Sequence, residues 1–412
     1  MNIRITPGPL EGTITPPPSK SIAHRALIAA ALSGGFSVLK NLAPSRDIQA
    51  TTACLRAMGA YFEELEGGGV RVHGLGSSIP QHREPWLVQF DCGESGSTLR
   101  FLIPVVLVVQ GGGIFTGRGR LMERPQKPYF DIFDEKRIFY EQKDGALTIQ
   151  GELKPGEYRL PGNVSSQFVT GLLYALPLME RESQIVLTSP LESRGYVDMT
   201  LDVLKDFGIT IENQNYARFI VPGDQWCAAR DCAVEADWSQ AAFWMAAGSL
   251  GNPVLTTGLN DHSVQGDRVI DEHFASFAWG MGRTVEIDVS DCPDLVPPLA
   301  VMAAFHDGTT RLVNAARLRL KESDRLDTVT KMLTALGGRV EEGSDCLVIP
   351  GTRFLNGGTV DGANDHRIVM AAAIAATRCT GPVTILGAEA VNKSYPDFWE
   401  EYKRLGGKFD VL

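Results

Sequence analysis

Basic and hydroxyl side chains gather at the start of the first helical pattern in the chain. Lys20 lies at the entrance of this pattern, Ser21 begins it, and Arg25 follows one turn further in. The first turn of a helix presents unpaired backbone N–H groups and the positive end of the helix dipole. Together with two cations, such an end suits a phosphate, with Ser21 as cap and hydroxyl donor. An ordinary capped helix has the same pattern, so this motif alone leaves both interpretations open.

Two later loops of the first half also suit an anion. The loop over residues 92–100 contains Gly96 and can bring backbone N–H groups close to a ligand, although it is not a Walker loop and no G-x-G-x-x-G motif occurs in the chain. The loop over residues 117–125 carries three arginines, of which we expect Arg118 or Arg120 to be an ordinary solvated charge. Neutral hydrogen-bonding side chains then follow, which suit a polyhydroxylated or phosphorylated molecule: Ser165, Ser166, Gln167 and, shortly after them, Ser193.

Carboxylates stand among cations in the second half. Asp294 lies at a helix start, where N-capping is the ordinary role of an aspartate. Residues 320–326 place Lys321, Glu322 and Arg325 before another helix. The remaining motifs are Asp365-His366-Arg367 and a loop that holds Lys393. Each of these motifs alone is weak, since loop charges are usually just solvated.

A repeated supersecondary unit positions these residues. Ala- and Leu-rich helical patterns begin at small, polar or charged residues six times: Ser21, Ser97, Ser166, Ser239, Asp294 and His366. Between them, helices end in a large apolar residue and a glycine before β-prone residues, at residues 58–62, 207–211, 281–285, 336–340 and 405–409. A sixth copy, near residues 129–140, lacks the glycine. The order favours six units of two helices and several short strands, although Leu-Gly before a strand is common in any α/β protein.

Composition excludes several classes of protein. The 412 residues include 39 Lys and Arg against 49 Asp and Glu, a net charge of −10. A general nucleic-acid binder is basic, so we expect no nucleic-acid partner, and any anion site must be a local cluster of cations. No apolar run reaches the length of a membrane span, and the N-terminus lacks the apolar stretch of a signal peptide. Seven scattered cysteines without a C-x-x-C pair indicate neither a disulfide framework nor a metal site, and they favour the cytoplasm.

Two turn-rich seams divide the chain into similar halves. They lie at residues 7–12 and 221–224. We therefore expect a first domain over residues 13–223 and a second over residues 1–12 plus 224–412, each with three units. The first dozen residues are expected to pair with the second half, which otherwise lacks a strand at its start. Two chain crossings of this kind are typical of a hinge that closes like a clam shell.

Taken together, the motifs resemble those of the 5-enolpyruvylshikimate-3-phosphate synthase family. They stand in the family's order between residues 18 and 396: residues 18–21 with Arg25, Gly96, residues 123–125, residues 165–167, residues 320–325, residues 365–367 and Lys393. The resemblance implies an α/β fold of two inverse domains, each of three βαβαββ units, which agrees with the repeats counted above. It also implies that no metal or organic cofactor is needed.

The implied reaction belongs to aromatic amino acid biosynthesis through the shikimate pathway. An enzyme of this family is a transferase, which moves the enolpyruvyl group of phosphoenolpyruvate to the 5-hydroxyl of shikimate 3-phosphate and releases phosphate, through a tetrahedral ketal. By the resemblance, shikimate 3-phosphate is bound by Lys20, Ser21, Arg25, Ser165, Ser166, Gln167, Ser193, Asp294 and Lys321. Phosphoenolpyruvate is bound by Lys20, Gly96, Arg124, Gln167, Arg325, Arg367 and Lys393.

Acid–base roles fall to a few of these residues. Asp294 resembles the family's general base on the attacking hydroxyl, and Lys20 is counted with the catalytic residues. Glu322 is our candidate for proton exchange at the methylene carbon, with Lys393 as competitor. The two substrates bring about six negative charges, which the matching cations balance. We expect a monomer with these two small molecules as its ligands.

Two rival functions differ in particular residues. The sister enolpyruvyl transferase, which acts on a UDP-linked N-acetylglucosamine, has Lys-Asn where Lys20-Ser21 stands and a cysteine in the loop that matches residues 117–123, which have none. A non-catalytic anion-binding or RNA-end-processing relative has no use for the carboxylates at Asp294 and Glu322. Two departures from the family pattern stand out, Arg317 in place of a neutral Asn and Glu94 in the glycine loop.

Overall fold

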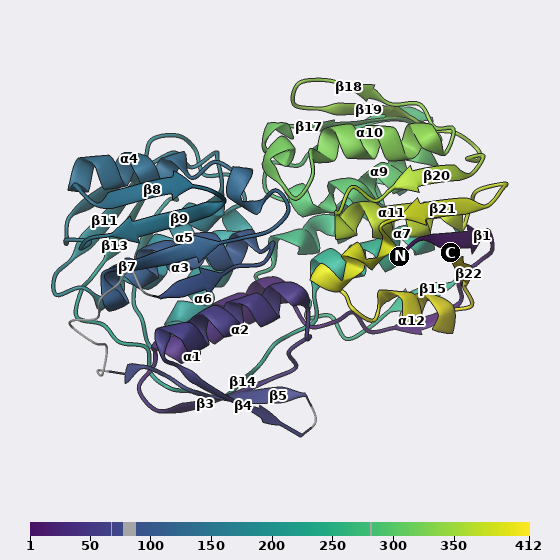
Figure 1. Ribbon diagram of the computed structural model, residues 1–412. Helices are drawn as coiled ribbons and strands as arrows, with labels where there is room; N and C mark the ends of the chain where they lie inside the picture. The colour runs from purple at the N-terminus through teal and green to yellow at the C-terminus, as the bar shows by residue number, and fades with distance from the viewer. Residues whose placement is uncertain (67, 77–87, 281) are drawn as a thin grey trace. The chain divides into compact units, whose positions relative to one another are not determined.

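Helices alternate with short strands along the whole chain (Figure 1). The computed structural model describes residues 1–66, 68–76, 88–280 and 282–412. It divides into two units, of which the first is Pro18–Glu235 and the second joins Met1–Pro17 to Ala236–Leu412. The sequence placed the same two crossings at residues 12/13 and 223/224. The crossings lie later because strand pairing extends each unit, as described next.

The first unit contains three four-stranded sheets. In each sheet the first two strands are parallel and the others antiparallel. The sheets, in spatial order, are β14 (Cys232–Ala233), β3 (Phe36–Lys40), β5 (Gly69–His73) and β4 (Tyr61–Leu65); β6 (Gln89–Asp91), β7 (Gly112–Thr116), β9 (Ala146–Gln150) and β8 (Phe139–Lys143); and β10 (Glu157–Leu160), β11 (Ser183–Leu187), β13 (Arg218–Val221) and β12 (Glu212–Gln214). Because β14 pairs with β3, this unit continues past residue 223.

Among the described residues of this unit, six α-helices accompany these strands, two for each sheet. They are α1 (Lys20–Leu32), α2 (Arg46–Met58), α3 (Gly96–Gln110), α4 (Lys127–Lys136), α5 (Ser166–Ala175) and α6 (Arg194–Asp206). In the two later sheets the odd-numbered helix connects the parallel strands, which is the usual crossover of a βαβ unit. The helix that follows leads into the antiparallel strands.

The second unit repeats this plan with one reduced copy. Its sheets are β15 (Val254–Thr256) with β2 (Gly12–Ile14); β16 (Arg283–Asp288), β17 (Gly308–Val313), β19 (Leu347–Pro350) and β18 (Glu341–Glu342); and β20 (Gly358–Asp361), β21 (Val383–Leu386), β1 (Ile3–Thr6) and β22 (Lys408–Val411). Within the described ranges, the sheet of β15 and β2 has only its parallel pair. Because β2 pairs with β15, the second unit extends past residue 12.

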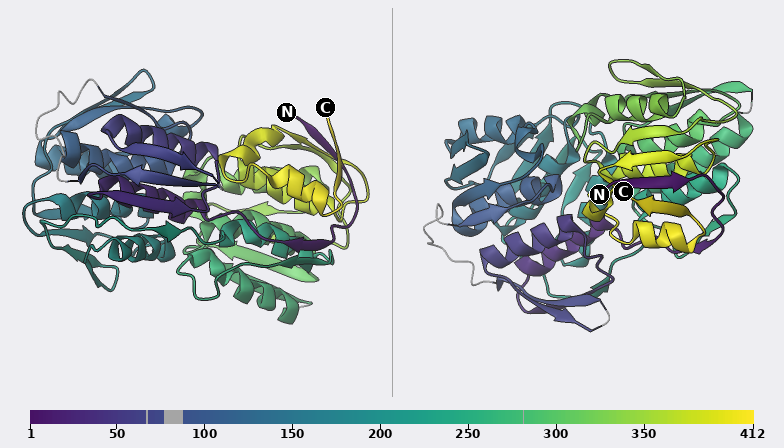
Figure 2. Two further views of the ribbon diagram at one scale, coloured as in Figure 1. Left: turned by 90° about the horizontal axis from the view of Figure 1, so that it is seen from below. Right: turned by 45° about the vertical axis from the view of Figure 1, so that its right-hand side comes forward.

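The helices of the second unit come in pairs as well. They are α7 (Trp238–Ser249), α8 (Ile270–Trp279), α9 (Val296–Ala304), α10 (Arg325–Ala335), α11 (His366–Ala376) and α12 (Phe398–Arg404). The first dozen residues pair with this half as expected, since β1 lies between β21 and β22. The two ends of the chain therefore lie side by side in all three views of the molecule (Figures 1 and 2). The α/β architecture of repeated units is thus confirmed.

Capping side chains stand one or two residues before several of the expected helix starts. Ser19, and not Ser21, caps α1, because its extended backbone lets the hydroxyl accept from the Ile22 N–H at 3.4 Å. Ser21 is the second residue of that helix, so its expected role as the cap is wrong. The other caps of this kind are Ser95, Ser165, Asp237 and Asp365.

Left-handed residues end the second helix of each pair. The glycine positions have φ of 113° at Gly59, 84° at Gly208, 73° at Gly282, 88° at Gly337 and 94° at Gly406. The predicted stop at Met281 falls partly outside the described residues, because Met281 is not among them. In the copy without glycine, Arg137 takes the left-handed conformation at φ 58° after α4. The repeat without glycine therefore has the same backbone conformation as the other repeats, although the left-handed conformation is unfavourable for an arginine.

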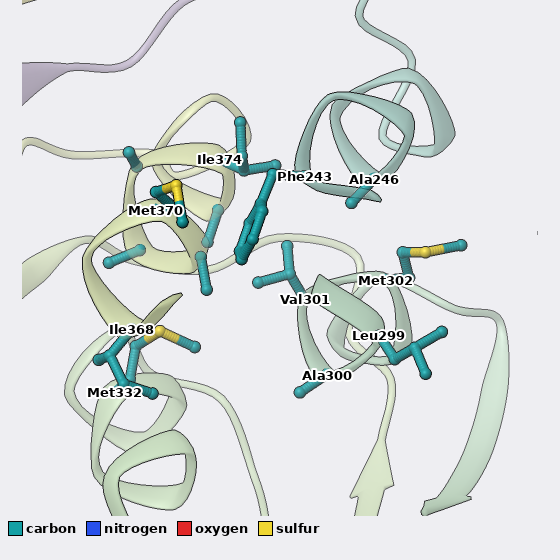
Figure 3. Close-up of a cluster of buried hydrophobic side chains, with 14 of the residues drawn as sticks. Phe243, Ala246, Leu299, Ala300, Val301, Met302, Met332, Ile368, Met370 and Ile374 are labelled. Carbon is teal, nitrogen blue, oxygen red and sulfur yellow. The ribbon is translucent and has the colours of Figure 1, made fainter. Parts of the chain in front are cut away.

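Three buried helices form the core of the second unit. Helix α11 is buried on all sides, and it contacts α7 and α9. In Figure 3 Phe243 of α7 points between Ile374 of α11 and Val301 of α9. Each fully buried side chain of this size contributes about 1.5 to 3 kcal/mol. This packing fixes the N-terminal ends of all three helices, which carry Ser239, Asp294 and Arg367.

Candidate functional site

A glycine, an arginine and a glutamine meet at the start of α3. A Cβ added to Gly96 would stand 2.8 Å from Nη1 of Arg124 and 3.4 Å from Oε1 of Gln167. The absence of a side chain at Gly96 therefore lets the guanidinium approach the first turn of the helix. Three residues that the sequence assigned to phosphoenolpyruvate thus lie together in the first unit.

Arg100 joins this group, although the sequence analysis gave it no role. Its Nη1 donates to Oε1 of Gln167 at 2.9 Å, and Nε2 of Gln167 donates to the Ser97 hydroxyl at 3.0 Å. The Arg100 guanidinium also lies 4.8 Å from the centre of the Phe168 ring. These contacts fix the orientation of the Gln167 amide, because its oxygen and its nitrogen each bind a side chain of α3. Arg100 stands one turn after Gly96, which was the signal available in the sequence.

Arg25 is bound inside the first unit. It is 2% exposed and donates to the Thr200 hydroxyl at 2.8 Å, to the Ser21 carbonyl at 2.7 Å and to the Tyr196 carbonyl at 2.8 Å. Burial lowers the pKa of this guanidinium to about 10. The contacts join α1 to α6, so Arg25 holds the start of α6 beside its own helix.

Lys20 and Ser193 flank that region. The Lys20 ammonium forms an ion pair with Asp47 at 2.8 Å, and both side chains are mostly buried. Sequence reasoning missed Asp47, since an aspartate in the first turn of a helix is ordinary. Ser193 is buried with φ 57° immediately before α6. Ser166 is buried at the start of α5, where the Ser165 hydroxyl accepts from the Gln167 N–H at 3.3 Å.

Three cations surround Asp294 in the second unit. Its Oδ1 accepts from Arg325 at 2.7 Å and from Lys321 at 3.2 Å, and its Oδ2 accepts from Arg367 at 2.9 Å. Asp294 lies in the short 3₁₀ helix Pro293–Leu295, and α9 begins after it without a side-chain cap. The N-capping alternative is therefore wrong for this residue. Its carboxylate is the centre of an ion cluster that α9, α10 and α11 bring together.

A second layer of carboxylates fixes Arg325. This side chain is 1% exposed, and it donates to Glu322 at 2.7 Å and to the fully buried Asp365 at 2.9 Å. Burial opposes its charge, but Asp365, Glu322 and Asp294 together raise the pKa of Arg325 well above its usual value. Asp365 loses solvation too, yet Arg325 lowers its pKa. Both groups therefore stay charged, as a buried pair must to be stable.

Asp365 both caps a helix and binds the ion cluster, and it was not among the site residues predicted from the sequence. One oxygen caps α11 by accepting from the Arg367 N–H at 3.0 Å, while the other accepts from Arg325 and from the Ser323 hydroxyl, each at 2.9 Å. The signal available in the sequence was that Asp365 precedes a helix and stands between the predicted cations Arg325 and Arg367. Capping alone would have been a sufficient explanation.

The other predicted residues of this unit lie in or near the same loops. Lys393 is 3% exposed and donates to the Asn364 carbonyl at 2.5 Å, beside the start of α11. Burial and the nearby Arg325 lower the pKa of Lys321, although Asp294 opposes them. Arg317 is buried and donates to the Ser290 carbonyl.

The arginine loop of the first unit, residues 117–125, agrees with expectation, because Arg118 is 76% exposed and pairs with Asp91.

Each unit thus assembles its own group of predicted residues. The first brings together Gly96, Arg124 and Gln167, and separately holds Arg25 against α6. The second gathers Asp294, Lys321, Glu322, Arg325 and Arg367. Within the described parts of the chain, no helix is long and apolar enough to cross a membrane.

Comparison with known proteins gives a consistent result. A model of the EPSP synthase family, described as 3-phosphoshikimate 1-carboxyvinyltransferase, matches residues 5–402. The 3-phosphoshikimate 1-carboxyvinyltransferase of Clostridium acetobutylicum is 47% identical over 419 residues, which cover 98% of this chain and 97% of that protein. The protein of that name from Clostridium kluyveri is 45% identical over 423 residues, which cover 99% and 98%. An EPSP synthase structure from Acinetobacter baumannii shares the fold, with a TM-score of 0.79, 24% identity and complete coverage of both chains. The chain therefore belongs to the EPSP synthase family.

Proposed function

We propose that the chain transfers the enolpyruvyl group of phosphoenolpyruvate to the 5-hydroxyl of shikimate 3-phosphate and releases phosphate. Its relatives are named 3-phosphoshikimate 1-carboxyvinyltransferase, and the chain is accordingly a transferase, which we assign to the shikimate pathway. The observation that most supports this function is that the carboxylate of Asp294 forms ion pairs with Lys321, Arg325 and Arg367. A protein that only captures anions gains nothing from a carboxylate at the centre of its cations. A proton-transfer enzyme with anionic substrates needs both.

The phosphoenolpyruvate residues divide between the units. Planar guanidinium groups suit a bidentate grip on phosphate and carboxylate, which favours Arg124, Arg325 and Arg367 for this substrate. Gly96 lies against both Arg124 and Gln167, so we assign the three residues to the same subsite. Lys20 and Lys393 complete the set that we assign to phosphoenolpyruvate.

Shikimate 3-phosphate takes the remaining hydroxyls and cations. We assign to it Lys20, Ser21, Arg25, Ser165, Ser166, Gln167 and Ser193 from the first unit, with Asp294 and Lys321 from the second. Hydroxyl and amide groups can each donate and accept, as a polyhydroxylated ring requires. The side-chain contacts of Arg25 and Gln167 restrict their rotamers, which reduces the entropy lost on binding.

The addition step moves two protons. Asp294 takes the proton of the attacking 5-hydroxyl, and either Glu322 or Lys393 delivers one to the methylene carbon of phosphoenolpyruvate, which becomes a methyl group. The resulting tetrahedral ketal then returns a methyl proton to the same Glu322 or Lys393 side chain as it expels phosphate, which restores the carbon–carbon double bond. Since both units contribute residues, we propose that substrate binding closes the two units on each other and excludes water from the ketal.

Phosphate release tests this function directly. The protein is incubated with phosphoenolpyruvate and shikimate 3-phosphate together, and free phosphate is assayed over time. Release that requires both substrates supports the proposal, whereas release with a UDP-linked N-acetylglucosamine in place of shikimate 3-phosphate supports the sister transferase. No release with either acceptor contradicts both transferase assignments.

We further propose that the protein works as a monomer in the cytoplasm. All seven cysteines are free thiols, which suits a reducing compartment. Each unit has its own extensive buried core, so neither needs a second copy to fold. Light scattering coupled to size-exclusion chromatography should give a mass near 44.7 kDa. A mass of twice that value would contradict the monomer.

A further inference from the structure

Ser239 connects the Asp294 cluster to a carboxylate that has no assigned role. This serine is buried in the first turn of α7. Its hydroxyl accepts a hydrogen bond from Nη2 of Arg367 at 3.3 Å and donates one to Oδ2 of Asp267. The same Nη2 of Arg367 donates to Asp294 at 2.9 Å. A continuous path of hydrogen bonds therefore runs from Asp267 through Ser239 to Arg367 and Asp294.

Asp267 is placed unusually for a group outside the proposed substrate contacts. It lies in the 3₁₀ segment Gly266–Val269 before α8 and is 4% exposed. Burial raises its pKa to about 6, Asp294 and Asp237 add to the shift, and Arg367 and the Ser239 hydroxyl oppose it. Keeping such a carboxylate in the interior costs folding free energy. A carboxylate whose burial lowers the stability of the fold, and which is joined by hydrogen bonds to a proposed substrate-binding arginine, is a candidate for a functional role.

The direction of the Ser239 O–H bond determines how Asp267 acts on Arg367. A serine has one hydrogen and two lone pairs, and the hydrogen rotates to the best acceptor available. With Asp267 as acceptor, the hydrogen points away from Arg367 and the lone pairs face the guanidinium. Without this acceptor, the hydroxyl can rotate and direct its hydrogen toward the cation. The guanidinium then loses the contact between its Nη2 atom and Ser239 and keeps the contact with Asp294.

We propose that Asp267 is a positioning residue for phosphoenolpyruvate, which orients the Arg367 guanidinium through the Ser239 hydroxyl. The inference rests on the proposed function, since it takes Arg367 as a ligand of that substrate. Asp267 itself touches no substrate. Because Asp294 still binds Arg367 when Ser239 does not, loss of the path weakens the grip and does not abolish it. Shikimate 3-phosphate is assigned to other side chains, so its binding should be spared.

A set of four variants tests the path. Asp267→Ala should raise KM for phosphoenolpyruvate about tenfold and change KM for shikimate 3-phosphate less than twofold. Ser239→Ala should do the same. Asp267→Asn keeps an acceptor for the hydroxyl and should restore most of the affinity, which a purely charge-dependent role would not predict. Asp271→Ala removes an exposed carboxylate four residues later and is the matched control, with both KM values unchanged.

The double variant decides whether the two residues act through one another. If Asp267 works through Ser239, the double Ala variant should match Ser239→Ala within twofold, because the path is already broken. Multiplied effects, or equal rises in both KM values, would overturn the proposal. If Asp267→Ala does not fold, Ser239→Ala and Asp267→Asn still carry the test: the first must be selective for phosphoenolpyruvate, and the second must keep most of its affinity.

The proposed function can fail independently. In that case the wild-type protein releases no phosphate, and calorimetric titration with phosphoenolpyruvate in the presence of shikimate 3-phosphate replaces the kinetic measurement. A tenfold weaker affinity in Ser239→Ala would then support the path even though the reaction is not the one proposed. Unchanged affinity in all variants would overturn the path alone.

Discussion

At the scale of single residues, the site is built from charges that are already paired. Asp294 binds three cations, and Arg325 binds three carboxylates. Such pairs hold each side chain in one rotamer before a substrate arrives, which reduces the entropy lost on binding. They also mean that removing one member leaves its partners buried without compensation.

Replacement of Asp294 tests its role as the base. Asp294→Ala should lower kcat by about a thousandfold, with a change of less than fivefold in either KM, since the group is needed mainly in the transition state. Steady-state phosphate release measures both constants. Asp294→Asn, which keeps the shape and an acceptor oxygen, should be equally slow. Near-normal turnover in the Asn variant would remove Asp294 from the proton transfer.

The buried carboxylate of Asp267 predicts a dependence of stability on pH. Its pKa is raised to about 6 in the folded protein, so the folded state binds this proton more tightly than the unfolded chain does. The contribution of Asp267 to stability is therefore largest below about pH 4 and is lost as pH rises to about 6.

Asp267→Asn cannot ionise and escapes this loss. Relative to wild type, its free energy of unfolding should improve by about 2 to 3 kcal/mol between pH 4 and pH 7. Urea denaturation at several pH values measures the difference. A difference that stays constant with pH would contradict an ionisation of Asp267 in this range.

The residues that sequence reasoning found and missed differ in a physical way. Asp294, Lys321, Arg325 and Arg367 were found because they form a dense pattern of charges, and the structure brings them together. Four others were missed: Asp47, Arg100, Asp267 and Asp365. Each occupies a position that has an ordinary explanation, such as a helix cap or a first turn. Only the three-dimensional contacts give these residues their other partners.

At the scale of elements, the repeat was readable and its exact edges were not. Apolar runs and left-handed glycines mark where a helix ends, and these signals are local. Several polar residues precede each helix, and the sequence does not show which of them is the cap. The observed caps, such as Ser19, Ser95 and Asp237, therefore lie one or two residues earlier than expected. The reduced sheet of β15 and β2 could not be predicted either. In the sequence its strands lie on either side of the first unit, and no local pattern records that pairing.

The repeat without glycine offers a stability test at this scale. Arg137 is exposed and left-handed at the end of α4, so Arg137→Gly should raise the free energy of unfolding by about 1 kcal/mol. The reverse change at the equivalent position after α6, Gly208→Ala, should lower it by a similar amount, since the added Cβ meets only an ordinary contact 3.6 Å away and the backbone supplies the strain. Chemical denaturation compares the two. A loss of stability in Arg137→Gly would show that the arginine side chain makes a compensating contact.

At the scale of the whole molecule, the residues proposed for each substrate are divided between the two units. A reaction that needs both sets needs the units to close, and two chain crossings permit such a hinge. Shikimate 3-phosphate should therefore reduce the radius of gyration measured by small-angle X-ray scattering at saturation. Inorganic phosphate at the same concentration is the control and should leave the curve unchanged. Identical curves with and without shikimate 3-phosphate would contradict closure.

The position of β1 between β21 and β22 has a consequence for how the chain is made. The first unit is complete once residue 235 has left the ribosome, so it can fold while synthesis continues. Strand β1 is synthesised before the first unit, whereas both of its neighbours, β21 and β22, are synthesised after that unit. The order of translation therefore delays completion of this sheet until β22 has been synthesised, long after β1.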